Sequence, residues 1–116
     1  MSIKMTIEEK HEIQARYRHL TNYQEEDPEA PIDPLTYVDS GGDHLLHIAA
    51  MRGDLNTVEV LLRVGDDINR RGEMGMTALH YARMQGNNEI AEFLLLHGAD
   101  GTLRDDFGRL AADIVR

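Results

Sequence analysis

The sequence contains no cysteine and no tryptophan, and it has only two phenylalanines and three prolines. Without cysteine, the chain has no disulfide scaffold, no thiolate metal ligand and no thiol nucleophile. No apolar run approaches the roughly 20 residues that a membrane-spanning helix needs. The N-terminal stretch reaches Glu8 and Glu9 without the apolar segment of a signal peptide. We therefore expect a cytoplasmic protein that does not bind membranes.

Basic residues are also few, because 12 Lys and Arg stand against 21 Asp and Glu, a net charge of −9. Such a surface repels the phosphates of nucleic acids and anionic lipids, so we expect no nucleic-acid binding. The charge suits a basic protein partner, although it also serves simply to keep a protein soluble and monomeric. With 116 residues, 41% of them hydrophobic, the chain is long enough for one domain with a buried core.

What the sequence does contain is an internal repeat with a step of 33 residues. The segment at 44–67, HLLHIAAMRGDLNTVEVLLRVGDD, returns at 77–100 as TALHYARMQGNNEIAEFLLLHGAD. An incomplete third copy surrounds Gly108. A repeat of this period indicates units that cannot bury their apolar face alone and that stack to form a common core. The matched pairs include His47 with His80, Gly53 with Gly86, and Gly65 with Gly98.

Each copy has the pattern of two short helices followed by a loop. In the second copy, Thr77 is suited to capping a first helix that ends near Gly86. A second helix, with apolar residues at helical spacing, begins at Asn88 and ends near Gly98. Small residues on the first helix and large ones on the second favour close antiparallel packing. The polar, glycine-containing stretches between copies suit hairpin-like loops, called fingers below. The predicted fold is all-α, a solenoid of stacked helix–turn–helix units.

These motifs resemble the ankyrin repeat, whose consensus reads G-x-T-P-L-H-x-A-A-x-x-G…V-x-x-L-L-x-x-G-A-D. The second copy, GMTALHYARMQGNNEIAEFLLLHGAD, departs from it where Ala78 replaces the proline and Arg83 replaces the second alanine. The first copy has His44 and Leu45 where Thr and Pro are usual, and the third has Asp113 in place of the histidine.

The resemblance covers residues 39–116, which we expect to form an ankyrin-repeat domain. It implies full repeats at about 39–71 and 72–104 and a partial unit at 105–116. The outer helix of the partial unit is absent, so part of the apolar side of the second repeat is predicted to face solvent or a partner.

Residues 1–38 precede the repeats. Thr6 and Glu9 have the spacing of a capping box, and Ile13, Tyr17 and Leu20 follow on one helical face, which predicts an amphipathic helix over 7–20. We expect this helix to cap the first repeat; the alternative is an independent partner-binding helix. The next stretch, TNYQEEDPEAPIDP, carries all three prolines and an acidic cluster, and it is predicted to be an extended or poorly ordered linker.

Candidate chemistry is sparse. His44 and His47 are three residues apart beside Asp43, a spacing that zinc sites use. The resemblance, however, gives His47 and its counterpart His80 a structural role, hydrogen bonding to a neighbouring loop, so we predict no metal. The sequence has no G-x-S-x-G, P-loop or dinucleotide-binding pattern, and we predict no cofactor and no catalysis. The acidic pairs Asp66–Asp67 and Asp105–Asp106 are expected to be solvated in loops.

Binding is therefore the predicted activity. The resemblance implies that partners contact the finger tips and the ends of the first helices, and methionine, arginine and aromatic side chains there suit an interface. Met51 and Met84 could equally belong to the core, whereas Met74 and Met76 favour the interface. The finger positions are Ser40, Gly41, Asp43, Glu73, Met74, Met76, Asp106, Phe107 and Arg109; the helix-end positions are Met51, Arg52, Met84 and Gln85; Arg71 and Arg104 precede the fingers.

Two functional hypotheses follow for a non-catalytic protein–protein interaction module. In the first, the protein is a monomer that binds and masks one partner in a heterodimer. Small, acidic, cysteine-free ankyrin proteins resemble bacterial immunity proteins that neutralise toxins, and opposite charge would speed association with a basic toxin. In the second, the protein is a scaffold or assembly subunit whose truncated third repeat drives homo- or hetero-oligomerisation.

Overall fold

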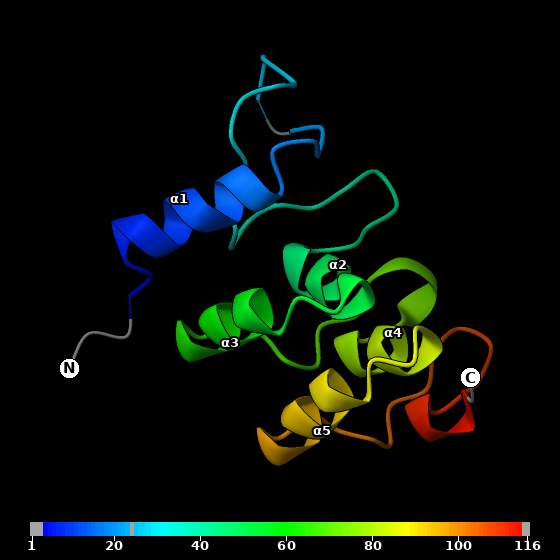
Figure 1. The fold of residues 1–116 in the computed structure, drawn as a ribbon. Coiled ribbons are helices and arrows are strands. Elements are labelled where there is room, and N and C mark those ends of the chain that lie inside the picture. Colours follow the sequence, from blue (N-terminus) through cyan, green and yellow to red (C-terminus); the bar gives the residue numbers. More distant parts are fainter. Residues whose placement is uncertain (1–3, 24, 115–116) are drawn as a thin grey trace.

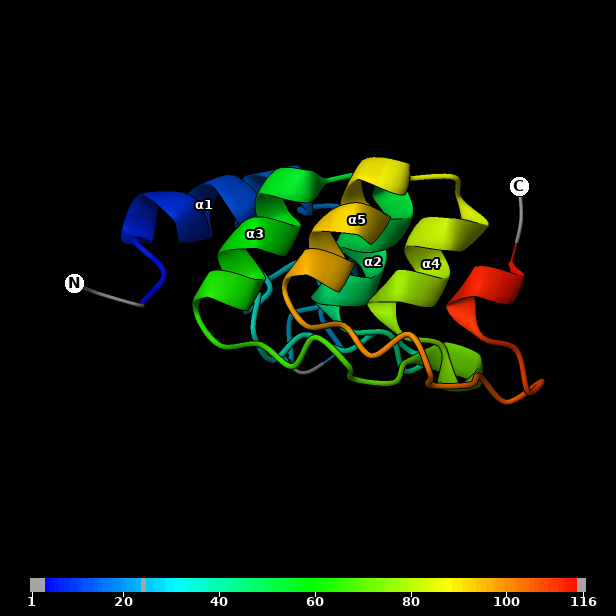
Figure 2. The same ribbon diagram turned by 90° about the horizontal axis from the view of Figure 1, so that it is seen from below.

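The computed structural model describes residues 4–23 and 25–114 of the chain. The repeat helices form two layers (Figures 1 and 2). The inner layer holds α2 (Leu45–Arg52) and α4 (Ala78–Met84), and the outer layer holds α3 (Leu55–Arg63) and α5 (Asn88–Leu96). The N-terminal helix α1 (Ile7–Arg16) lies beside α3. The predicted all-α solenoid is confirmed.

Short turns join the two helices of each repeat. Gly53 ends α2 in the left-handed conformation, with φ 77°, which a glycine adopts without steric cost. Asp54 then caps α3 by accepting a hydrogen bond from the Thr57 amide at 3.2 Å. In the second repeat the equivalent residue is Asn87, whose Nδ2 donates to the carbonyl of Ala50 at 2.9 Å. The second turn therefore also holds the two repeats together.

The core lies between the two layers. Ala49, Ala50 and Ala82 are completely buried where α2 packs on α4, and their small side chains let these two inner helices approach closely. Leu61 and Leu94 are equally buried on the outer helices. Small residues are thus present on the inner helices as predicted, but these helices also bury large side chains such as Leu46 and Tyr81, so the division between small inner and large outer residues is only partial.

One histidine in each repeat, His47 or His80, hydrogen-bonds to the backbone of the loop that follows that repeat. The Nδ1 of His47 accepts a hydrogen bond from the amide of His44 at 2.9 Å, and its Nε2 lies 2.8 Å from the carbonyl oxygen of Arg70. His80 repeats this arrangement, with Nε2 2.9 Å from the carbonyl oxygen of Arg109. The structural role predicted for this pair is confirmed. Because both ring nitrogens are engaged, neither histidine offers a free atom to a metal.

The N-terminal helix packs on the first repeat as a cap. The predicted capping box between Thr6 and Glu9 is present. The helix ends at Arg16 rather than at residue 20, because the chain turns so that the Leu20 amide bonds the Tyr17 carbonyl at 3.0 Å. This turn leaves Tyr17 buried and still brings Leu20 against the core.

Asp54 holds this cap in place. Its carboxylate accepts a hydrogen bond from the Tyr17 hydroxyl at 2.7 Å and one from Arg16 at 3.1 Å, in addition to those from Thr57. Burial opposes ionisation of Asp54, but the hydrogen bonds from Thr57 and Tyr17 outweigh it, so the pKa of this carboxyl lies below its ordinary value.

The stretch 21–34 is predicted to be extended or poorly ordered. Its described residues form no helix or strand, and residues 25–29 are exposed, but the segment is anchored by buried side chains on both sides of this exposed part. Ile32 and Tyr37 are buried in the core. Asn22 is also buried, and its Nδ2 donates to the Pro31 carbonyl at 3.0 Å. The Nε2 of Gln14 on α1 donates to the Ile32 carbonyl at 2.9 Å. These side-chain donors satisfy the irregular backbone, which lets it pack without regular secondary structure.

The chain continues past the second repeat with one short 3₁₀ helix, η2 (Ala111–Asp113). Ala111 is buried, and η2 packs against α4 in the position of a third inner helix (Figure 2). Within the described part of the chain, none of the helices has the length and apolar character required to cross a membrane.

Candidate protein-binding surface

Three fingers follow one another along one side of the molecule (Figure 1). They span residues 39–43, 72–76 and 105–109. Each is closed by the same hydrogen bond, from the amide of its first residue to the carbonyl of its last, at 2.9, 2.8 and 2.9 Å. The amide of Asp106 also donates to the Met74 carbonyl at 2.9 Å, so the second and third finger tips are adjacent.

The first residue of a finger organises its backbone. Asp105 accepts hydrogen bonds from the amides of Phe107 and Arg109, both at 2.9 Å, and its carboxylate is buried. The expectation that Asp105 would be solvated is therefore wrong, because the tight turn directs its side chain inward. Burial opposes ionisation here, but the hydrogen bonds from Arg109 and Phe107 lower the pKa of Asp105 below its ordinary value. Likewise, Asp66 is mostly covered and pairs with Arg70 at 2.6 Å.

The second finger begins instead with Gly72, and Asp43 of the preceding finger takes over the role of the missing side chain. Its Oδ1 accepts a hydrogen bond from the Glu73 amide at 2.9 Å. Both of its oxygens lie 2.8 Å from the hydroxyl of Tyr81 on α4. A Cβ at position 72 would collide with the Asp43 carboxylate and the His47 ring, so only glycine allows this approach. The bonds of Asp43 therefore join the two repeats.

Two residues predicted to contact a partner are thus removed from the accessible surface. Asp43 is buried by Tyr81 and Glu73, and Met76 is only 6% exposed and belongs to the core. They are 33 residues apart and occupy the last position of their fingers. The chain turns there into the following helix, which directs the side chain toward the interior.

The exposed tips carry two large apolar side chains. Met74 is 49% exposed and Phe107 is 66% exposed. Met74 has φ 57°, and it is the one non-glycine residue with positive φ in the described part of the chain. A left-handed conformation costs a side chain such as methionine about 1–2 kcal/mol. Ser40, Gly41, Glu73 and Asp106 are also exposed beside these tips.

The arginines around the fingers mainly support finger geometry. Arg71 donates to the Gly75 carbonyl at 3.1 Å and also to the carbonyl of Arg104 in the next finger. Arg104 donates to the Gly108 carbonyl at 2.7 Å. The guanidinium of Arg109 pairs with the buried Asp105 at 2.8 Å. In the two bonds to glycine carbonyls, the arginine precedes the glycine by four residues, a spacing that is visible in the sequence.

The ends of the first helices contribute less exposed surface than predicted. Met51 and Met84 are partly buried and pack against the core, so the structure gives each of them a core contact while leaving part of the side chain accessible. Gln85 is also partly buried. Arg52 is exposed but is directed toward the N-terminal segment, where it donates to the His19 ring at 2.7 Å and lies over the Tyr17 ring.

A family model described as ankyrin repeats, in three copies, matches residues 19–105. This range is most of the chain, and together with the stacked helix pairs it shows that the chain belongs to the ankyrin-repeat family. The match begins before the first repeat that the sequence alone predicts. Comparison with curated proteins gives no match. Ankyrin repeats are protein–protein interaction modules, and membership of the family implies this function for the chain.

Proposed function

We propose that the protein binds another protein through its finger surface, defined as the exposed tip residues Ser40, Gly41, Glu73, Met74, Asp106 and Phe107. The observation that supports this proposal best is Met74. An exposed methionine at a position that favours asparagine or glycine lowers stability and places apolar surface in water. Strained residues are concentrated at functional sites, so a binding role would account for both the backbone strain and the exposed apolar surface.

Phe107 extends the same apolar surface on the neighbouring tip. The guanidinium of Arg109 lies over its ring at 5.2 Å from the centroid, which restricts its orientation before a partner arrives. Aromatic anchors held in this way lose little conformational entropy on binding. Met74 and Phe107 together are therefore the proposed anchors.

The net charge of −9 favours a basic partner, because opposite charge speeds association. At the tips, the side chains of Glu73 and Asp106 form no ion pair among the described residues. The exposed Arg71 and Arg104 beside them donate to backbone carbonyls and form no ion pair there either, so the support for a basic partner comes from the charge of the whole chain. The protein would then mask the basic surface of its partner as a heterodimer, in the manner of an immunity-type inhibitor of a basic toxin.

The alternative role, assembly through the incomplete third repeat, draws on a different surface. Leu95 is 44% exposed and Leu96 is 83% exposed on α5, which is followed by η2 and not by a further full repeat in the described residues. A second copy or a larger protein that covered these leucines would make the chain a scaffold. The two roles predict different sensitive residues, so one experiment separates them.

The test is affinity capture from a lysate of the source organism at low and high salt. A Met74→Ala/Phe107→Ala variant removes the anchors, and a Leu95→Ala/Leu96→Ala variant is the matched control on α5. The proposal expects one dominant basic partner that high salt and the finger variant both remove and that the α5 variant retains. If only the α5 variant loses the partner, or if the molecular mass of the purified protein rises with its concentration, the assembly role would be established instead.

A further inference from the structure

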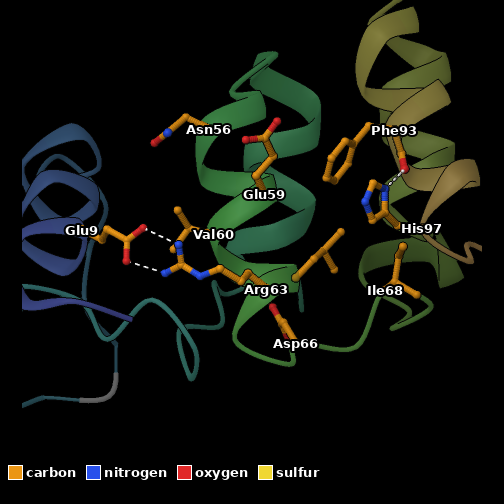
Figure 3. A pocket seen from close by; sticks show the side chains of 10 residues that line it. Glu9, Asn56, Glu59, Val60, Arg63, Asp66, Ile68, Phe93 and His97 are labelled. Atoms are coloured by element: carbon orange, nitrogen blue, oxygen red, sulfur yellow. Dashed lines mark hydrogen bonds and ion pairs between the residues drawn. The ribbon is translucent and has the colours of Figure 1, made fainter. Parts of the chain in front are cut away.

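A groove of about 570 Å³ opens on the outer layer, between α3 and α5, with α1 at one end (Figure 3). It is separate from the finger surface, and none of its lining residues belongs to a finger. Its apolar lining includes Leu62, Ile68 and Phe93, all only partly buried. Phe93 projects from α5 toward α3 (Figure 3). The groove therefore leaves apolar side chains of the two repeats partly exposed.

Phe93 is fixed before any ligand binds. The His97 ring stacks on it with a centroid distance of 4.0 Å. The Nδ1 of His97 lies 2.8 Å from the Phe93 carbonyl oxygen, a hydrogen bond that orients the imidazole. A wall that is held in place in this way lowers the entropy lost when a ligand enters the groove.

The charged residues that line the groove are three carboxylates and one guanidinium: Glu9, Glu59, Asp66 and Arg63. Glu9 pairs with Arg63 across one end, with Nη1 and Oε2 2.9 Å apart, and Asp66 pairs with Arg70 at 2.6 Å. Among the described residues, Glu59 has no ion-pair partner and is exposed on α3. The groove therefore combines an apolar lining with an uncompensated negative charge.

The shape of the groove indicates a helical ligand. α3 and α5 are the equivalent helices of two successive repeats, each of nine residues, so each wall is roughly 13 Å long. On α3, Asn56, Glu59 and Arg63 share one face, and on α5, Phe93 and His97 are one turn apart. Two such walls match two to three turns of an amphipathic helix, a common mode of recognition.

We propose that this outer groove is a second binding site, which takes a basic amphipathic helix from a partner protein. Leucine, methionine or phenylalanine side chains of that helix would contact Phe93 and Leu62, and a lysine or arginine beside them would pair with Glu59. A second copy of this chain does not fit, because α1, α3 and α5 carry no net positive charge, and α2 and α4 bury most of their residues in the core.

The probe is a synthetic leucine/lysine amphipathic peptide of about 18 residues, long enough to be helical when bound. Its twin has glutamate in place of every lysine. Titration into the isotopically labelled protein, followed by amide chemical shifts, is expected to show saturable changes concentrated on α3, α5 and residues 62–68 with the lysine peptide alone. Equal binding of the glutamate peptide, or changes confined to the fingers, would overturn the proposal.

A pair of charge-matched variants separates the groove from general acidity. Glu59→Lys and Glu29→Lys each replace one exposed glutamate, and Glu29, in the N-terminal segment, does not line the groove. The proposal expects Glu59→Lys to weaken the lysine peptide at least about tenfold and Glu29→Lys to weaken it less than about twofold. Equal weakening would assign the binding to overall charge. The Met74→Ala/Phe107→Ala variant should retain the peptide, so this test does not depend on the proposed finger surface.

Discussion

Replacing Asp43 with alanine should be among the most damaging single changes in the inter-repeat contact. Asp43→Ala removes the acceptor for the Tyr81 hydroxyl, at 2.8 Å, and for the Glu73 amide, at 2.9 Å. A hydrogen bond to a charged group contributes about 1.5–3 kcal/mol, and a buried donor left without a partner costs about 1–3 kcal/mol. Because two donors lose one shared acceptor, we expect the free energy of unfolding to fall by roughly 3–5 kcal/mol. Domains of this size are stable by about 5–15 kcal/mol.

The assay is urea denaturation followed by circular dichroism, with Tyr81→Phe and the double variant completing a thermodynamic cycle. Tyr81→Phe alone should cost about 1–3 kcal/mol, and the two changes should be less than additive by roughly 1–2 kcal/mol because they share one contact. Asp106→Ala is the control, since this exposed carboxylate forms no ion pair in the described structure, and it should stay within about 0.5 kcal/mol. A loss below about 1 kcal/mol for Asp43→Ala, or strict additivity, would refute the inter-repeat role of this residue.

Three further predictions concern other positions. Gly72→Ala should lower the melting temperature by several degrees in a thermal scan, because its Cβ would collide with Asp43; an unchanged melting temperature would contradict the close approach. Met74→Asn should raise the free energy of unfolding, measured by urea denaturation, by about 1 kcal/mol, because asparagine tolerates positive φ. The same change should weaken partner capture. A loss of stability would show that Met74 is not strained. The pKa values of Asp54 and Asp105 lie below the ordinary 3.8. The stability that these carboxylates contribute should therefore be complete above about pH 4 and be lost as the pH falls through their pKa values in the folded protein. Thermal scans from pH 7 to pH 2 should show this loss, and the melting temperature of Asp54→Asn should depend less on pH.

The helices could be predicted from the sequence because their signals are local. Thr77 caps α4 and Gly53 ends α2, as their residue types and spacing indicate. The step of 33 residues then places equivalent helices in the same layer, which is enough to define the solenoid. The histidine pair was also predictable, since the family pattern gives each ring its role.

The direction of individual finger side chains could not be predicted in the same way. Met74 and Met76 flank Gly75 and look equivalent in the sequence, yet one is at the exposed tip and the other is in the core. The difference depends on how the finger turns into α4. The contact between Asp43 and Tyr81 joins residues 38 positions apart, and nothing in either local sequence indicates it.

Neither the packing of the N-terminal segment after α1 nor the outer groove could be predicted from the sequence, for related reasons. Proline and acidic residues suggested poor order, but Ile32 and Tyr37 are buried there and Asn22 binds the backbone around them. The groove depends on the separation of α3 from α5, which belong to different repeats. Helical periodicity gives the face on which Phe93 lies, but it does not give the space left beside that face.

The most direct test of the finger surface as the binding site is hydrogen–deuterium exchange on the complex with its captured partner. If the fingers bind the partner, amide exchange at residues 39–43, 72–76 and 105–109 should be slower in the complex than in the free protein, with the far end of α5 unchanged. Protection at Leu95 and Leu96 without protection of the fingers would contradict a finger-bound partner and place the partner on α5.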